Sequence, residues 1–400
     1  MNNWKELEQK YFLRTVNRVP VTLVRGEGTW AWDDEGRKYL DFVAGWAVNS
    51  LGHCHPAVVQ AIAEQAGSLI QASNQFYTLP QIQLAELLIQ HSCLDRVFFC
   101  NSGAEADEGA VKLARKYGRL HLDGAYEVIT TFNSFHGRTL AMVAATGQHK
   151  FQEAYVPLPS GFINVEYDSA EAIMAGTTER TCAVMLETIQ GEGGVNIPHQ
   201  EGYLKKVRQW CDDKGILLVL DEIQTGLGRT GTLFGYEQYG IEPDIMTLAK
   251  GLGGGIPIGA ILAKERASVF EAGDHGSTFG GNPVACAAAC ATLKFIMEND
   301  IPTSVAQVGD YFIGRLQALQ AKHASVAEVR GRGLLIALGF NTAIADKVLE
   351  ACLQRGLLTN LVRPDALRFM PPLTVTRDEI DQAVDILEDA LVEVSKELSE

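Results

Sequence analysis

Asp221 and Lys250 are the two residues whose types and positions point most directly to chemistry. Asp221 follows the apolar run Ile216–Leu220, and Lys250 follows a second apolar run, Ile245–Ala249. Continuous runs of β-formers predict strands that are buried on both faces of a parallel sheet. In open α/β sheets, ligands bind beyond the carboxyl ends of the strands. We therefore expect a carboxylate and an amine nucleophile to face a small molecule at one edge of the sheet.

This pair of residues has a specific chemical use. A lysine that forms a Schiff base, together with a carboxylate that keeps a pyridine nitrogen protonated, meets the requirements of pyridoxal phosphate. Each residue also has a simpler interpretation. An Asp after a strand commonly caps a turn or helix, and a Lys before glycines commonly ends a helix in solvent. The other motifs of the chain decide between these interpretations.

The segment Val97–Glu105 predicts a strand, then a turn of small residues at Ser102, Gly103 and Ala104, then a helix. The N–H groups at a helix start bind anions, and a glycine there lets a phosphate approach the backbone closely. Ser102 and Glu105 also fit a capping box, S-x-x-E. The two interpretations are compatible, so the turn remains a candidate phosphate site.

An aromatic residue and an arginine follow the predicted strand Glu127–Phe132. Phe135 is able to stack on a flat ring, and Arg138 is able to hold a carboxylate in bidentate fashion. A core aromatic residue and a surface arginine are the simpler alternatives. His136, between them, is expected to be no more than a neutral hydrogen-bonding neighbour.

Four further polar residues are candidates for ligand contacts. Glu192 lies in a glycine-flanked loop, where it is either a solvated acid or an acid near a substrate amine. Arg368, on a C-terminal strand, is either a surface residue or the binding site of a second carboxylate. The hydroxyls of Ser277 and Thr278 precede a helix rich in Ala and Cys, so they either reach a phosphate or cap that helix.

The elements that position these residues predict an α/β fold with two domains. Strands and helices alternate from about 95 to 265, which predicts a mostly parallel central sheet with helices on both faces. The C-terminal part reads as a compact α+β unit whose last helix opens with a capping box at Thr376 and Glu379. We expect it to pack with an N-terminal β-ribbon. The expected division is a large domain over 55–295 and a small, discontinuous domain over 1–54 and 296–400.

Composition excludes several classes of partner and site. The chain has 400 residues and a formal net charge of −15, which argues against nucleic acid or an acidic membrane surface as partner. Its eight cysteines lack CxxC spacing, so we expect reduced thiols, no disulfide framework and no metal site. The N-terminal residues lack the pattern of a signal peptide, and no apolar run approaches membrane-spanning length. A cytoplasmic protein is expected.

A literal G-x-G-x-x-G at Gly226–Gly231 keeps a different class of enzyme open, a nicotinamide-dependent dehydrogenase. As a dinucleotide fingerprint it should follow its strand directly and open a helix. Here Asp221 to Thr225 intervene, and no clear helical pattern follows. We therefore interpret it as a chance match. A non-enzymatic phosphate-binding or interaction protein is a third alternative.

Taken together, these motifs resemble the class III, or ω-type, pyridoxal-phosphate aminotransferases. The resemblance runs from about residue 10 to 395, with the motifs in order, and is strongest at Asp221–Gly231 and Ser277–Pro283. It implies the fold type I of pyridoxal-phosphate-dependent transferases, pyridoxal 5'-phosphate as cofactor, and a homodimer whose subunits share their active sites.

The resemblance also implies roles for the residues that would contact the coenzyme. Lys250 forms the Schiff base and Asp221 holds the pyridinium nitrogen. The other implied contacts are Gln224 near the ring hydroxyl, Phe135 on the ring, Ser102, Gly103 and Ala104 around the phosphate, and Thr278 on the phosphate of the neighbouring subunit.

For the substrates, the resemblance implies that Arg138 grips a carboxylate and that Ser277 belongs to the same site. Glu192 pairs with Arg368 when the amine donor is bound and releases it when the 2-oxo acid binds. The implied reaction moves the δ-amino group of N2-acetylornithine to 2-oxoglutarate by ping-pong kinetics. Ornithine, succinylornithine, succinyldiaminopimelate and 4-aminobutyrate remain alternative donors.

The sequence departs from the family pattern at three positions. Thr188 stands where a proline is common, Asp107 replaces a frequent asparagine, and Trp46 occupies the place of a smaller aliphatic residue. We expect none of the three to touch the chemistry. Trp46, near the expected substrate entrance, bears on which donor is accepted. The absence of a tyrosine beside it mildly favours an acylated donor.

Overall fold

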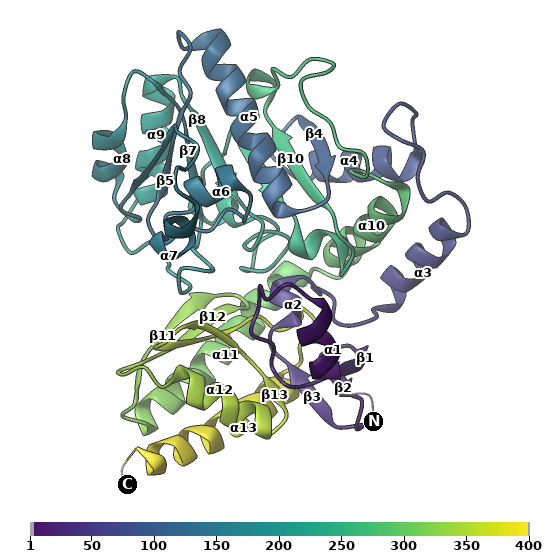
Figure 1. Ribbon diagram of the computed structural model, residues 1–400, viewed down its shortest axis with the longest axis vertical. Helices are drawn as coiled ribbons and strands as arrows, with labels where there is room; N and C mark the ends of the chain where they lie inside the picture. Colours follow the sequence, from purple (N-terminus) through teal and green to yellow (C-terminus); the bar gives the residue numbers. More distant parts are fainter. Residues whose placement is uncertain (1–3, 399–400) are drawn as a thin grey trace.

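A computed structural model describes residues 4–398 of the chain and contains three sheets (Figure 1). The termini of the expected small domain, 1–3 and 399–400, lie outside the described residues. The largest sheet has seven strands. In spatial order they are β4 (Arg96–Cys100), β10 (Gly259–Ala263), β9 (Ile245–Leu248), β8 (Leu217–Asp221), β7 (Thr181–Glu187), β5 (Glu127–Thr131) and β6 (Phe162–Val165).

The seven-stranded sheet is mostly parallel, as expected. The strands from β9 to β6 run parallel to their neighbours, whereas β10 is antiparallel to both β9 and β4. Every residue of β8 is buried, which explains its uninterrupted apolar sequence. Because β8 and β9 are adjacent and parallel, Asp221 and Lys250 lie at the same edge of the sheet.

Helices cover both faces of this sheet, so β8 divides its side chains between two hydrophobic cores. Leu218 and Leu220 join the core that includes α9, and Leu217 and Val219 join the core beneath α5. The helices of this part are α3 (Pro56–Ala66), α4 (Leu79–Gln90), α5 (Gly103–His121), α6 (Leu140–Ala145), α7 (His149–Gln152), α8 (Ala170–Gly176), α9 (Tyr203–Lys214) and α10 (Pro283–Glu298).

The remaining elements form two smaller sheets and their helices, in the lower half of Figure 1. One sheet has the order β11 (Val326–Arg332), β12 (Leu335–Phe340), β15 (Ala366–Phe369) and β14 (Asn360–Arg363). The other has the order β1 (Leu23–Glu27), β2 (Trp30–Asp33), β3 (Lys38–Asp41) and β13 (Leu357–Leu358). The accompanying helices are α1 (Trp4–Tyr11), α11 (Ile301–Lys322), α12 (Ala345–Gln354) and α13 (Arg377–Glu397).

The two ends of the chain share a sheet. β13 pairs in parallel with β3, with Leu357 opposite Leu40 and Leu358 opposite Asp41. In Figure 1 the purple β1–β3 ribbon accordingly lies beside the yellow-green C-terminal elements. The expected packing of the N-terminal ribbon with the C-terminal unit is therefore found.

The two predicted capping boxes differ in the structure. At α13 both halves form, because the side chains of Thr376 and Glu379 each accept a hydrogen bond from the other residue's backbone N–H. At α5, the Ser102 hydroxyl accepts from the Glu105 N–H at 3.2 Å, but the Glu105 carboxylate accepts from the Asn101 N–H at 2.9 Å. In a complete capping box the Glu105 carboxylate would accept from the N–H of Ser102, so this hydrogen bond is shifted by one residue toward the N-terminus.

One short segment has an unusual backbone. The four residues of α2 (Ala44–Ala47) have φ values of +47, +64, +62 and +62°, so this is a left-handed turn. Only Gly45 among them adopts such angles without a steric penalty. The turn packs against the segment that begins at Lys250.

The helix α3, which begins at Pro56, carries apolar side chains that are exposed toward its end. α3 ends at Ala66, which is exposed, and Leu69 lies beyond it with 43% of its surface exposed. The apolar residues that follow are also exposed. Among residues 4–398, no helix combines the length and the apolar character needed to cross a membrane.

Candidate active site

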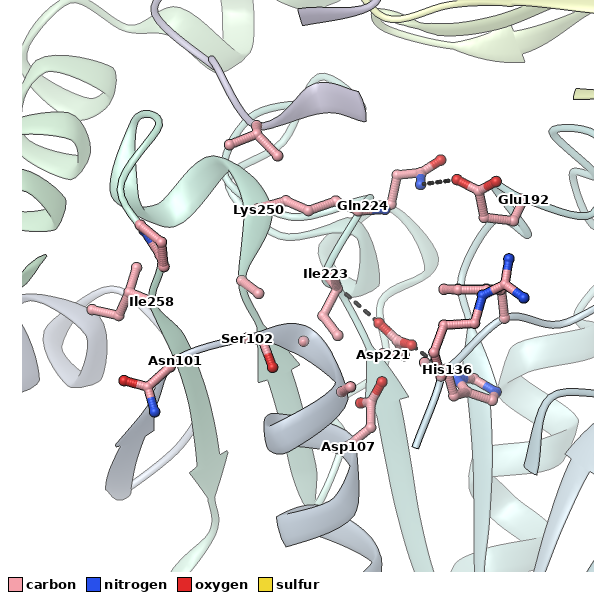
Figure 2. A pocket seen from close by; sticks show the side chains of 18 of the residues that line it. Asn101, Ser102, Asp107, His136, Glu192, Asp221, Ile223, Gln224, Lys250 and Ile258 are labelled. Atoms are coloured by element: carbon pink, nitrogen blue, oxygen red, sulfur yellow. Dashed lines mark hydrogen bonds and ion pairs between the residues drawn. The ribbon is translucent and has the colours of Figure 1, made fainter. Parts of the chain in front are cut away.

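A cavity of about 430 Å³ opens at the carboxyl ends of β8 and β9 (Figure 2). It brings together most of the residues that the sequence singled out. Those that line it are Ser102, Gly103, Ala104, Phe135, Arg138, Glu192, Asp221, Gln224 and Lys250. The position agrees with the rule that ligands of α/β sheets bind beyond the strand ends.

Asp221 is the last residue of β8 and is only 4% exposed. One carboxylate oxygen accepts a hydrogen bond from His136 Nδ1 at 2.8 Å, and the other accepts from the Ile223 N–H at 3.0 Å. Burial lowers the pKa of His136, but the hydrogen bond and charge of Asp221 outweigh it and raise that pKa above its ordinary value. His136 is thus a hydrogen-bonding neighbour of Asp221, and the carboxylate beside it favours the protonated imidazole.

Lys250 begins the 3-10 helix η3 (Lys250–Gly253) with φ at +38°, a sparsely populated angle for a residue with a side chain. In Figure 2 its side chain extends toward Gln224. Burial lowers the pKa of the Lys250 amine, and Arg368 lowers it further, against the opposing charges of Glu192 and Asp221. A lowered pKa increases the fraction of neutral amine, which is the nucleophilic form.

The first turn of α5 forms one wall of the cavity. Ser102, Gly103 and Ala104 lie at its start, where the N–H groups of a helix have no intrahelical acceptors. A Cβ atom on Gly103 would lie 2.7 Å from Ile223 Cδ1, so the close packing of this turn against the Asp221 loop depends on a glycine. The turn thus fits the requirement for an anion cradle.

Arg368, which is buried, forms an ion pair with Glu192, which is partly exposed and lines the cavity. Arg368 is 0% exposed, and its Nη1 lies 2.9 Å from Glu192 Oε1 and 3.0 Å from Gln224 Oε1. Asn360 Oδ1 accepts further hydrogen bonds from the same guanidinium. Burial raises the pKa of Glu192, but the charges of Arg368 and Lys250 together lower it below its ordinary value. The surface-arginine and solvated-acid alternatives are therefore wrong.

Phe135 and Arg138 lie together on the loop after β5. Phe135 is partly buried and lines the cavity. The guanidinium carbon of Arg138 is 3.9 Å from the ring centre of Phe151 and 5.4 Å from that of Phe135. Arg138 is exposed at the cavity mouth, so a ligand carboxylate is able to reach it from solvent.

Ser277 and Thr278 are not brought into this chain's own cavity. Ser277 Oγ accepts a hydrogen bond from Asn101 Nδ2 at 2.9 Å, and Asn101 lines the cavity. Thr278 is exposed, and its carbonyl accepts from Gln71 at 2.5 Å. Neither hydroxyl caps α10, whose N-cap is Asn282.

Two buried carboxyl groups belong to the site although the sequence did not single them out for it. Glu187 lies at the end of β7, and burial raises its pKa to about 7. Asp107, on α5, is 0% exposed and lines the cavity. Asp107 thus lies within the cavity lining, and the expectation that the change at this position leaves the chemistry untouched stays a prediction. The i, i+4 spacing of Asp107 from Gly103 was a signal for it, because such residues share a helix face.

The glycine-rich segment Gly226–Gly231 forms turns and is followed by the short 3-10 helix η2 (Gly235–Tyr239). It therefore lacks the helix that a dinucleotide fingerprint opens. Arg229 within it is buried and donates hydrogen bonds to the carbonyls of Leu334 and Pro371. The segment thus connects the large sheet with the C-terminal elements.

The chain is similar in sequence to one family over nearly its whole length. The model of the family described as Aminotransferase class-III matches residues 11–391. An acetylornithine aminotransferase of Caldanaerobacter subterraneus is 53% identical over 388 residues, covering 97% of this chain and 98% of the relative. An acetylornithine aminotransferase of Methanocaldococcus jannaschii is 49% identical over 397 residues, covering 98% of this chain and 99% of the relative.

Solved structures with the same fold are also aminotransferases. The ornithine aminotransferase from Toxoplasma gondii ME49 has a TM-score of 0.94 at 34% identity, covering 98% of this chain and 95% of that one. A further structure of that enzyme has partial occupancy of PLP at its active site. Its TM-score is 0.95 at 33% identity, covering 99% of this chain and 95% of that one. The acetylornithine aminotransferase from Elizabethkingia anophelis has a TM-score of 0.87 at 34% identity, covering 98% of each chain.

Proposed function

Because the chain belongs to the class-III aminotransferases, we propose that it transfers the δ-amino group of N2-acetylornithine to 2-oxoglutarate. The products are N-acetylglutamate 5-semialdehyde and glutamate, as in arginine biosynthesis. The observation that supports this most directly is the buried amine of Lys250, placed in one cavity with Asp221, the α5 anion cradle and the Glu192–Arg368 pair.

The cofactor is pyridoxal 5'-phosphate, which supplies an aldehyde that reacts with amines and a protonated ring that accepts electrons. The residues of the cavity fit this group. Lys250 would hold the aldehyde and Asp221 would hold the proton of the ring nitrogen. The remaining contacts would come from Phe135 on the ring, Gln224 beside the ring hydroxyl, and the N–H groups of Ser102, Gly103 and Ala104 on the phosphate.

Lys250 has a second role as the group that moves a proton. When free of the coenzyme, its neutral Nζ would take a proton from the substrate carbon and later return one. The lowered pKa of this amine favours the neutral form that accepts the proton. His136 and the Ile223 N–H hold the Asp221 carboxylate in place, where it would keep the ring nitrogen protonated.

The Glu192–Arg368 pair supports a switch between two dissimilar substrates. A donor with one free carboxylate binds Arg138 and leaves Arg368 neutralised by Glu192. 2-Oxoglutarate has two carboxylates, so its second one displaces Glu192 and forms a bidentate pair with Arg368. Ser277, beside Asn101 at the edge of the cavity, would complete the substrate site.

A homodimer with shared active sites belongs to the same proposal. Thr278 is exposed in the single chain, and it would contact the phosphate held by a second copy. Large apolar side chains are exposed nearby, which favours a protein partner on this surface. They are Leu69 43%, Ile70 62%, Phe76 66%, Tyr77 95%, Leu79 74% and Phe279 63%. The cytoplasm is the compartment we propose for the enzyme.

The proposal is tested with a panel of amino donors against 2-oxoglutarate. The protein loaded with coenzyme is expected to be yellow, to lose that absorbance when N2-acetylornithine is added, and to regain it with 2-oxoglutarate. Ornithine, succinylornithine, succinyldiaminopimelate and 4-aminobutyrate serve as competitors for the donor site. A faster reaction with any of these would reassign the donor, and a Lys250→Ala protein that turned over at the wild-type rate would refute the mechanism.

A further inference from the structure

Asp107 lies one layer behind Asp221. It is fully buried on α5, and Figure 2 shows its carboxyl group directed toward Asp221. One carboxylate oxygen of Asp107, one of Asp221 and one ring nitrogen of His136 all lie within 4.8 Å of one another. Two carboxyl groups and one imidazole therefore lie close together, and at most 4% of the surface of each residue is exposed to water.

The two carboxyl groups have very different surroundings. Asp221 accepts hydrogen bonds from His136 and from the Ile223 N–H. Within residues 4–398, neither oxygen of Asp107 accepts a hydrogen bond of good geometry, and the nearby Thr247 hydroxyl favours the charged form only in part. A buried carboxylate with so little support from donors is disfavoured relative to the neutral acid. The surroundings therefore stabilise the charge on Asp221 and oppose it on Asp107.

The other ionisable groups that face Asp107 do not offset this. They are Glu187 on β7, an additional acid, and Cys100 on β4, whose pKa burial raises to about 12. The strand β10 and the helix α6, which also pack on this side of the sheet, are apolar. Burial, and after it the charge of Asp221, raise the pKa of Asp107 well above its ordinary value, and the Thr247 hydroxyl opposes this only in part.

We propose that Asp107 is a positioning residue that carries a proton in the working enzyme and donates it as a hydrogen bond to Asp221. This inference rests on the proposed function only in that Asp221 faces the coenzyme ring. The O–H of Asp107 acts as a third donor to the Asp221 carboxylate, with His136 and the Ile223 N–H. By stabilising the ionised form of Asp221, it keeps the shared proton on the ring nitrogen rather than on Asp221.

The proposal is tested on two variants of Asp107, one that keeps a hydrogen-bond donor at this position and one that removes it. Asp107→Asn keeps the size and a hydrogen-bond donor but removes the ionisable group, whereas Asp107→Ala removes the donor as well. We expect the dissociation constant of pyridoxal phosphate, measured by fluorescence titration of the apoprotein, to change less than about threefold in Asp107→Asn. In Asp107→Ala it should rise by about tenfold or more, as for other residues that orient a binding group. Equal losses in both variants would overturn the proposal.

Infrared spectroscopy detects the proton itself. At about pH 8.5, Glu187 and Glu222, whose pKa values are about 7, are mostly ionised. The coenzyme-loaded wild type should still show the carbonyl band of a protonated carboxyl group, with its shift in D2O. Asp107→Asn should lack this band, and the matched control Glu222→Gln should keep it.

Absence of the band in the wild type, or its persistence in Asp107→Asn, would overturn the proposal. The Asp107→Asn spectrum remains informative if Asp107→Ala fails to fold. Neither measurement depends on the amino donor, so failure of the proposed substrate would leave this test intact.

Discussion

The chemistry of single residues in this protein depends on which charges are buried together. Arg368 is wholly buried and is bonded to Glu192, Gln224 and Asn360. Its only carboxylate partner among residues 4–398, Glu192, is on a loop rather than on a strand. A loop residue is able to move away at low cost, so the guanidinium becomes available to a ligand when Glu192 leaves.

The first prediction concerns this pair. Arg368→Ala should weaken 2-oxoglutarate by about 2–5 kcal/mol, because a buried bidentate contact is lost, and should weaken the amino donor far less. The measurement is the KM of each substrate in the two half-reactions. Arg363→Ala, which removes an exposed arginine paired with Asp365 in the turn that follows β14, is the control and should change neither value. Equal weakening of both substrates by Arg368→Ala would contradict the switch.

The second prediction uses a buried acid outside the cavity. Burial raises the pKa of Glu222 from 4.5 to about 7. Between these values the folded state binds more protons than the unfolded state, so the free energy of unfolding should fall as pH rises from about 4.5 to about 7. The Glu222 carboxyl group changes the free energy of unfolding by at most about 3 kcal/mol over this pH range. Glu222→Gln should flatten this part of the pH dependence in urea titrations, whereas the exposed Glu265→Gln should retain the wild-type slope. An unchanged slope in Glu222→Gln would exclude this residue as the source.

At the residue scale, sequence identified the side chains better than it identified their contacts. Asp221 and Lys250 were found because each follows a buried strand, and the strand ends converge in any parallel sheet. The contacts of Arg368 with Glu192 and Gln224 join distant segments and have no local signal. Asp107 was noted only as a departure from the family pattern, because its position beside Asp221 depends on how α5 is rotated against β8.

At the scale of elements, close helix packing depends on residues without side chains. α5 contacts several strands of the central sheet and its neighbouring loops along its length. Near its C-terminal end, a Cβ on Gly118 would lie 2.1 Å from the carbonyl oxygen of Ala125 and 2.7 Å from Cys182 Cβ. Backbone cannot move aside as a flexible side chain does, so this position is restricted to glycine.

The third prediction compares two helical glycines. Gly118→Ala should destabilise the protein by about 1–3 kcal/mol, because the new methyl group overlaps the Ala125 backbone. Gly314→Ala, at an exposed position of α11 with open space around its Cβ, should stabilise it by about 0.5–1 kcal/mol. Chemical denaturation of both variants gives the comparison. A Gly118→Ala protein as stable as Gly314→Ala would show that α5 shifts freely.

The apolar patterns largely predicted which segments form helices and which form strands. They predicted less well where these elements end. The predicted strand Ile216–Leu220 agrees with β8 within one residue, and α9 ends before Gly215, which adopts φ +68°. Beyond Pro56, Val58, Ile62, Ala66 and Leu69 recur at helical spacing, but Ala66 and Leu69 are exposed in the single chain. An apolar pattern in a sequence does not distinguish side chains of the core from apolar side chains on the surface.

At the scale of the whole molecule, we propose the division into a large domain, 55–295, and a small domain from both chain ends, 1–54 and 296–400. The arrangement of the three sheets supports it, because the seven-stranded sheet lies wholly within the first range. The two smaller sheets draw all of their strands from the second. The cavity lies at the strand ends of the large sheet, with Glu192 reaching Arg368 of the C-terminal elements.

The fourth prediction concerns the exposed apolar surface near Thr278. Tyr77→Asp places a charge at the most exposed of these side chains and should shift the protein from dimer to monomer in sedimentation velocity. Since Thr278 would then be lost from the partner's site, the affinity for pyridoxal phosphate should fall in parallel. Val392→Asp, at an exposed apolar position on α13, is the control and should leave the dimer intact. A Tyr77→Asp protein that remained dimeric would place the interface elsewhere.

The pairing of β13 with β3 has a consequence for biosynthesis. The ribbon β1–β3 leaves the ribosome early, but its partner strand, Leu357–Leu358, emerges only after ~300 further residues, which take on the order of 15–60 s to translate. Until then Leu40 has no neighbour on that edge. The nascent chain therefore carries an unpaired strand edge for most of its synthesis, and the first segment made is among the last to be completed.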